Sequence, residues 1–146
     1  MDQSDKRIDI VLVEDNEDHV ELIKHSLEGL STTNRILHFD NAEEAYKYLS
    51  PSEGTEKHTK PGLVLLDVNL PGMNGHDLLK RIKEDDELRS IPVVMLTTSS
   101  GESDRELAYR YHANSYLVKP IDFEQFEKMV LDLGIYWSVW NKRKFD

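Results

Sequence analysis

Hydrophobic residues fall along the chain in two alternating patterns. One is a short, nearly continuous apolar run, which is typical of a strand buried on both faces. Five such runs cover residues 8–13, 36–39, 63–68, 92–97 and 116–118. The other pattern has apolar residues three and four positions apart, as on one face of an amphipathic helix. This spacing predicts helices over residues 17–30, 41–49, 75–83, from 103 onward and from 122 onward.

The order of these elements predicts the fold class. Strand and helix alternate strictly through five units, which indicates an α/β fold with a parallel sheet and helices on both faces. Its crossovers should be right-handed. In an open sheet of this kind the ligand site lies beyond the carboxyl ends of the strands. Functional residues are therefore expected directly after the predicted strands.

Polar residues mark several of the predicted helix starts. Asn41 with Glu44, and Ser103 with Glu106, have the spacing of a capping box. Asp122 stands where it can cap the last helix. These three positions are therefore predicted as helix N-termini.

Composition narrows the class of protein. The length of 146 residues suits one domain with one core, and 38% of the residues are hydrophobic, which argues against wholesale disorder. No apolar run is long enough for a membrane span, and the absence of cysteine excludes disulfides and thiolate chemistry. The net charge of −10 argues against general binding to nucleic acid or to an anionic membrane. A cytoplasmic location is the default expectation.

Six polar residues stand at or just after the predicted strand ends. They are Glu14 and Asp15 at the first strand, Asp67 at the third, Thr97 and Thr98 at the fourth, and Lys119 at the fifth. The acidic first loop lacks the glycines of a phosphate-cradling dinucleotide loop. Clustered carboxylates attract a hard divalent cation such as Mg2+, or Mn2+ or Ca2+ in its place. The six histidines have no metal-ligand spacing and are predicted to be surface or core residues.

The charges of this set suit phosphoryl transfer. Three carboxylates, one lysine and a divalent cation sum to zero, so the metal would remove the electrostatic barrier to an incoming phosphoryl group. One carboxylate could act as nucleophile and form an aspartyl phosphate. The metal and Lys119 would neutralise charge on the transferring group, and the Thr97 hydroxyl could hydrogen-bond to a phosphoryl oxygen.

The segments around these residues resemble the receiver domain of two-component response regulators. The resemblance covers about residues 8–133 and rests on the order and spacing of four segments. They are Val11–Asp15 (VLVED), Leu65–Gly75 (LLDVNLPGMNG), Ile91–Thr97 (IPVVMLT) and Tyr116–Pro120 (YLVKP). The resemblance implies a flavodoxin-like sheet with strand order 2-1-3-4-5. It also implies a signalling domain rather than an enzyme, with a sensor histidine kinase as its partner.

The same resemblance implies a phosphoacceptor and a metal site. Asp67 would receive the phosphoryl group. Asp15, Asp67 and the backbone carbonyl of Asn69 would bind Mg2+, with Glu14 acting from behind them or through a water molecule.

Further roles follow from the resemblance for the last two strand ends. Thr97 would be the switch hydroxyl, Lys119 the phosphoryl-binding cation and Tyr116 an aromatic rotamer switch. Thr98 places unusual bulk beside the phosphoryl group, where a smaller residue is commoner in the family. Pro120 is a candidate for a cis peptide bond.

A narrower resemblance is to the single-domain regulators paired with bacterial phytochrome histidine kinases. It rests on the long Pro- and Gly-containing loop Ser50–Gly62 and on the aromatic segment Ile135–Trp140. We expect one receiver domain over residues 1–146, with a core at about 8–133 and a helical aromatic extension at about 134–146. We also expect a homodimer through the last two helices, the fifth strand and this extension. Its apolar surface would come from Leu107, Tyr111, Phe126, Trp137 and Trp140.

Two other functions remain open from the sequence. One is a phosphate-independent interaction module with the same fold. The other is a phosphatase of the haloacid-dehalogenase type, which also uses an aspartate nucleophile and Mg2+. Such a phosphatase needs a second aspartate two positions after the first, where this chain has Asn69.

Overall fold

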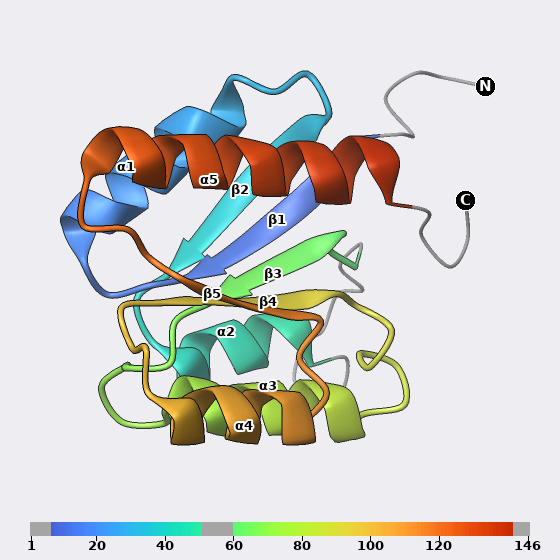
Figure 1. Cartoon of the computed structure of the whole chain (residues 1–146). Coiled ribbons are helices and arrows are strands. Elements are labelled where there is room, and N and C mark those ends of the chain that lie inside the picture. The colour runs from blue at the N-terminus through green and yellow to red at the C-terminus, as the bar shows by residue number, and fades with distance from the viewer. Residues whose placement is uncertain (1–6, 51–59, 142–146) are drawn as a thin grey trace.

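A computed structural model describes residues 7–50 and 60–141 of the chain (Figure 1). In this part of the chain, five strands alternate with five α-helices. The strands are β1 (Ile8–Val13), β2 (Thr33–Phe39), β3 (Leu63–Leu66), β4 (Val93–Thr97) and β5 (Ser115–Val118). The helices are α1 (Glu17–Glu28), α2 (Ala42–Leu49), α3 (Gly75–Glu84), α4 (Glu102–Arg110) and α5 (Phe123–Ile135). Helix α5 continues into a short π-helical segment, Tyr136–Trp140.

The strands form one parallel sheet in the order β2-β1-β3-β4-β5, which confirms the predicted flavodoxin-like fold. In Figure 1, α1 and α5 cover one face of the sheet, and α2, α3 and α4 cover the other. The strand order reverses at β1, which pairs with β2 on one side and β3 on the other. The loops after β1 and β3 therefore meet at the switch point, where ligands bind in open α/β sheets.

Alternate side chains of β1 enter two separate hydrophobic clusters. Val11 and Val13 pack with side chains of α2 and α3, whereas Ile10 and Leu12 pack with side chains of α1 and α5. Both faces of this strand are buried, which explains its mostly apolar sequence. Burial on two sides fixes the position of the strand end from which the site is built.

Two strand boundaries differ from the sequence prediction by more than one residue. Strand β2 begins at Thr33 rather than at residue 36, because it pairs with β1 from Ile8 onward. Strand β3 ends at Leu66 rather than at residue 68. Asp67 is therefore the first residue beyond the strand.

The helix caps confirm two predictions and correct one. Asn41 accepts a hydrogen bond from the Glu44 amide at 2.8 Å, and Asp122 accepts one from the Gln125 amide at 3.0 Å. The prediction for Ser103 is wrong, because α4 begins at Glu102 and has Gly101 as its N-cap, with no side-chain capping hydrogen bond.

The aromatic residues near the C-terminus divide between core and surface. Phe126 and Trp137 are buried against the sheet with α1, so the prediction that they supply partner surface is wrong. They belong to one helical stripe with Val130 and Leu133, at spacings of three and four residues, and this stripe faces the core. Trp140 lies beyond the stripe, and 74% of its surface is exposed.

Three further expectations concern the peptide bond before Pro120, two segments at the limits of the described residues, and membrane spans. The described residues contain no cis peptide bond, so the bond before Pro120 is trans, the form that X–Pro bonds favour, and the predicted cis bond is wrong. The predicted loop Ser50–Gly62 and extension 134–146 lie partly outside the described residues. Within the described ranges, no helix has the length and apolar character needed to cross a bilayer.

Candidate functional site

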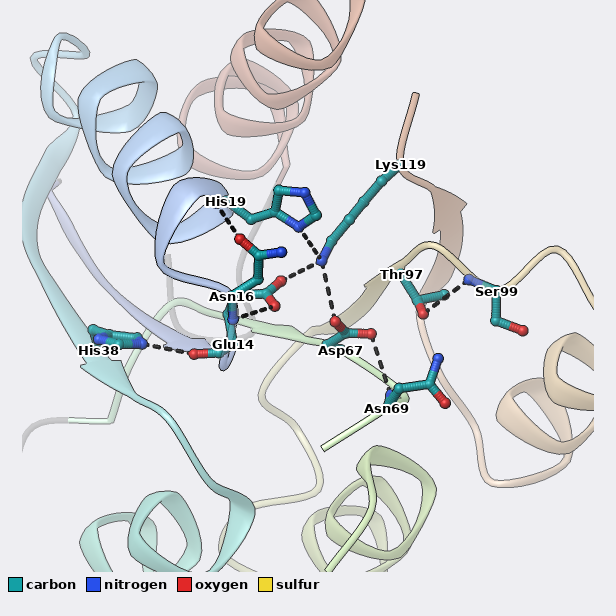
Figure 2. A network of polar contacts seen from close by, with 9 residues as sticks. All are labelled: Glu14, Asn16, His19, His38, Asp67, Asn69, Thr97, Ser99 and Lys119. Carbon is teal, nitrogen blue, oxygen red and sulfur yellow. Dashed lines mark hydrogen bonds and ion pairs between the residues drawn. The ribbon is translucent and has the colours of Figure 1, made fainter. Parts of the chain in front are cut away.

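Four strand ends bring polar side chains together at the carboxyl edge of the sheet (Figure 2). Glu14 and Asp15 follow β1, Asp67 follows β3, Thr97 ends β4, and Lys119 follows β5. Parallel pairing of β1 with β3, β3 with β4 and β4 with β5 aligns these ends. The structure thus gathers the residues that the sequence places at strand ends.

The three carboxylates form one cluster. Glu14, Asp15 and Asp67 each offer an oxygen that lies within 4.8 Å of the others. Glu14 and Asp67 are buried, whereas Asp15 is exposed. Carboxylate oxygens grouped beside solvent suit a hard cation such as Mg2+, which keeps several water ligands. The donor set therefore fits a divalent cation.

Lys119 is the buried cation of the site. Its side chain is 1% exposed, and its Nζ donates hydrogen bonds to Glu14 Oε1, to Asp67 Oδ2 at 3.1 Å and to His19 Nδ1 at 3.0 Å. Its backbone amide donates to the Thr97 carbonyl at 2.7 Å, which ties the residue to the end of β4. An ammonium has three N–H donors, so all of them have partners here.

Glu14 is held from several directions. The Asn16 amide donates to Glu14 Oε2 at 3.2 Å, and His38 Nε2 donates to the Glu14 backbone carbonyl at 2.8 Å. Burial raises the pKa of Glu14 from its usual 4.5 to about 7, although the hydrogen bond and the charge of Lys119 act in the opposite direction. Lys119 therefore limits how far burial raises the pKa of this carboxyl group.

Backbone contacts fix Asp67. Its amide donates to the Val13 carbonyl at 3.1 Å, and its Oδ1 accepts a hydrogen bond from the Asn69 amide at 3.3 Å. The first residue of α3, Gly75, approaches so closely that a Cβ there would lie 2.0 Å from the Asp67 carbonyl oxygen. The Gly75 amide donates to the Val68 carbonyl at 2.9 Å. The start of α3 therefore packs directly on the backbone of Asp67.

A second set of hydrogen-bonded residues extends from Thr97 toward α4. The buried Thr97 Oγ1 accepts a hydrogen bond from the Ser99 amide at 3.2 Å. The Tyr116 hydroxyl donates to the Ser99 carbonyl at 2.8 Å, and Ser99 Oγ donates to Asp104 Oδ2 at 2.5 Å. Burial raises the pKa of the half-buried Tyr116. Ser99 thus joins the threonine, the tyrosine and the first turn of α4.

The other predicted residues differ in their exposure. Asn69 and Thr98 are exposed, while Leu107 on α4 and Tyr111, the residue just after α4, are half-buried. The Tyr111 ring also lies 5.5 Å from Lys80 Nζ, so one of its faces is occupied within the chain.

Sequence reasoning missed two residues of the site, His19 and Ser99. His19 is three residues beyond Asn16, whose side chain caps α1 by accepting from the His19 amide at 3.1 Å. The asparagine before an amphipathic helix is a recognisable start signal, and it would have placed His19 at the same sheet edge as Asp15. Ser99 carries no comparable signal.

The acid cluster, buried lysine and buried threonine lie at the carboxyl edge of a five-stranded parallel sheet, and the clustered carboxylates at the switch point of this α/β protein could hold a divalent cation. The chain belongs to the response regulator receiver domain family, whose profile matches residues 10–131. The receiver domain is a signalling module of two-component systems rather than a classical enzyme.

Similar proteins of known class support the assignment to this family. The probable methanogenesis regulatory protein FilR2 of Methanothrix harundinacea is 44% identical over 133 residues, which are 91% of this chain and 85% of FilR2. The response regulator Rcp1 of Synechocystis sp. is 33% identical over 93% of this chain and 92% of its own length.

Solved structures give the same result. The phosphorylated cyanobacterial phytochrome response regulator RcpA has a TM-score of 0.89 at 33% identity, with 94% of this chain and 99% of RcpA covered. The Mn2+-bound form of Rcp1 has a TM-score of 0.86 at 32% identity, with 93% and 98% covered. The carboxylate cluster of this chain is consistent with a metal site, and Rcp1 is a relative whose structure is known with bound Mn2+.

Proposed function

We propose that this chain is a response regulator that accepts a phosphoryl group from a sensor histidine kinase on Asp67, in a reaction that requires Mg2+. The observation that carries the proposal is the position of Lys119, whose ammonium contacts both Asp67 and Glu14 inside the carboxylate cluster. A buried carboxylate beside a fixed cation and a candidate metal site suits an acceptor of phosphoryl groups.

The proposed reaction exchanges one bond to phosphorus for another. An oxygen of Asp67 bonds to phosphorus while the P–N bond of phosphohistidine breaks, and the leaving imidazole keeps the electron pair and takes up a proton. A divalent cation held by Asp15, Asp67 and the Asn69 carbonyl would supply positive charge to the phosphoryl oxygens. Lys119 turns an N–H from Asp67 to a phosphoryl oxygen, and the Thr97 hydroxyl offers another hydrogen bond.

The output of the proposed reaction is a changed protein–protein contact surface. The elements that change are Thr97, the loop that follows it, and Tyr116. The hydrogen bonds at Ser99 support this proposal, because they connect all three parts to α4. A shift of Thr97 toward the phosphoryl group would break its bond to the Ser99 amide.

Mass spectrometry after incubation with acetyl phosphate and Mg2+ tests the proposal. The wild type should gain about 80 Da, the mass of one phosphoryl group. Asp67→Asn should gain nothing, whereas Asp77→Asn, a matched change at an exposed aspartate of α3, should react like the wild type. An unchanged adduct in Asp67→Asn would refute the assignment.

The two other functions left open by the sequence predict different results. Sustained turnover of a phosphate ester would indicate a haloacid-dehalogenase-type phosphatase. Equal affinity for a partner with and without beryllofluoride would indicate a phosphate-independent module.

The proposal extends to partners and organisation. The similarity to RcpA and Rcp1 supports a phytochrome-type histidine kinase as the phosphoryl donor, and phosphotransfer from a purified kinase of that type tests it. We also propose a cytoplasmic single receiver domain over residues 1–146, with its core at about 8–133. Its homodimer would form through α4, β5, α5 and the extension, with Leu107, Tyr111 and Trp140 at the surface.

A further inference from the structure

His19 directs its ring at the ammonium of Lys119 (Figure 2). Its Nδ1 lies 3.0 Å from Lys119 Nζ. On its backbone side the residue is fixed by the Asn16 cap of α1, and its ring packs edge-on against Phe126 of α5 with centroids 5.3 Å apart. Cap and ring contact together leave the imidazole little freedom to turn away.

The chemistry of the pair fixes the role of each atom. A lysine ammonium has only donors, so His19 Nδ1 accepts the hydrogen bond and carries no proton. Burial and the charge of Lys119 both lower the pKa of His19, which favours the same neutral imidazole. His19 therefore holds the ammonium without adding negative charge, whereas a carboxylate at this position would repel a phosphoryl group.

The three acceptors of Lys119 differ in what the proposed reaction does to them. Asp67 becomes an acyl phosphate, so its carboxylate charge is replaced by the negative charge of the phosphoryl oxygens, and Glu14 belongs to the carboxylate cluster that suits a cation. His19 is the acceptor that neither phosphorylation nor the metal alters. We propose that His19 is a positioning residue that keeps the Lys119 ammonium aimed at the phosphoryl site while Asp67 and Glu14 change partners. This inference rests on the function proposed above.

Phosphorylation rates with acetyl phosphate and Mg2+ test the proposal. His19→Leu should react about tenfold more slowly, the scale of one lost hydrogen bond to a charged group. His19→Asn, whose Oδ1 can replace Nδ1 as acceptor, should recover most of the rate. His25→Leu, the same change at an exposed histidine in the last turn of α1, should react like the wild type.

A double-substitution cycle separates positioning from a general structural effect. If His19 acts through Lys119, then His19→Leu should slow the reaction no further once Lys119→Met is present. Equal slowing in the wild-type and Lys119→Met backgrounds would overturn the proposal, and so would an unchanged rate in His19→Leu.

A measurement without phosphoryl transfer keeps this inference distinct from the proposed function. The NMR signal of the Lys119 ammonium should be protected from exchange in the wild type and in His19→Asn, and it should broaden in His19→Leu. A signal that stays equally protected in His19→Leu would overturn the positioning role. If the wild type accepts no phosphoryl group, the proposed function fails, and this signal alone decides the role of His19.

Discussion

Glu14 and Lys119 form an ion pair that is almost closed to solvent, with side-chain exposures of 2% and 1%. They lie 105 positions apart, after β1 and β5, so the pair exists only when the sheet is complete. Lys119 balances one of the three clustered carboxylates, which leaves two net negative charges when all three are ionised. The folded protein therefore carries unfavourable repulsion that a divalent cation would relieve.

The first prediction concerns the metal. At a hundredfold excess over its Kd, Mg2+ should raise the free energy of unfolding of the wild type by about 2.7 kcal/mol. Asp15→Asn should lose most of this gain, and without Mg2+ it should be at least as stable as the wild type because one repelling charge is gone. Thermal unfolding with and without Mg2+ measures both effects. Asp18→Asn, at an exposed position in α1, is the control, and equal Mg2+ stabilisation of Asp15→Asn and wild type would contradict the role of Asp15.

The second prediction concerns the approach of α3 to the phosphoacceptor. Gly75→Ala places a Cβ 2.0 Å from the Asp67 carbonyl oxygen, and this backbone cannot move aside without moving Asp67. We expect a loss of about 3 kcal/mol in the free energy of unfolding, the upper range for overpacking. Urea unfolding measures it. Gly29→Ala is the matched control, because its nearest outside atom is 3.7 Å away; equal stability changes in the two variants would contradict the packing argument.

The carboxylate cluster and the contact between Gly75 and Asp67 differ in how far the sequence alone could predict them. An apolar run that ends at a polar residue is visible without a structure, so Asp67 and Lys119 could be placed at one sheet edge from the alternation of strands and helices. The close approach of Gly75 to Asp67 could not be predicted from the sequence, because it depends on the path of the chain from the loop after β3 into α3.

The stripe of large residues in α5 marks a similar limit. Its spacing predicts one helix face, but it does not say whether that face meets the sheet or a partner. In the structure, Phe126 and Trp137 fill the cluster beneath α1, while Trp140 falls outside it after the helix changes to π geometry. The spacing alone could therefore not show that Phe126 and Trp137 are buried, and the change in helical pitch that separates Trp140 from them has no clear sequence signature.

The third prediction concerns the loop between β4 and α4. Helix α4 has no side-chain cap, and the hydrogen bond from Ser99 Oγ to Asp104 is what ties its first turn to the loop. Ser99→Ala should weaken that turn by about 1 kcal/mol, or about fivefold in hydrogen-exchange protection. Amide exchange over residues 105–108, whose amides bond to the carbonyls at the start of the helix, measures the effect. Ser103→Ala, at an exposed position of the same helix, should leave protection unchanged, and equal exchange in both variants would show that Ser99 does not anchor the turn.

The fourth prediction concerns pH and Lys83 on α3. Burial lowers the pKa of Lys83 from its usual 10.5 to about 8. Between these two values the unfolded chain binds more protons than the folded one, so this group favours folding more as pH rises from about 8 to 10.5. The stability of the wild type relative to Lys83→Met should therefore increase across that range in urea unfolding.

The difference between variants isolates Lys83 from the other groups that titrate at high pH. Lys128→Met, at an exposed position on α5, should show no such trend relative to the wild type. A constant difference between wild type and Lys83→Met would mean that the ammonium keeps its proton. Its hydrogen bonds to the carbonyls of Arg89 and Ile91 and to Asn114 Oδ1 would then outweigh burial.

The fifth prediction concerns the homodimer. The end of α5 and the π-helical segment expose Tyr136, Val139 and Trp140, and Trp140 is the largest of these side chains. If this face forms the proposed interface, Trp140→Ala should weaken dimerisation by about 2 kcal/mol, or about thirtyfold in Kd, as for a central aromatic anchor. Ile121→Ala removes an exposed apolar side chain just before α5, at the opposite end from Trp140, and should have no effect. Sedimentation over a range of concentrations measures the change, and a wild type that stays monomeric with and without phosphorylation would rule out this interface.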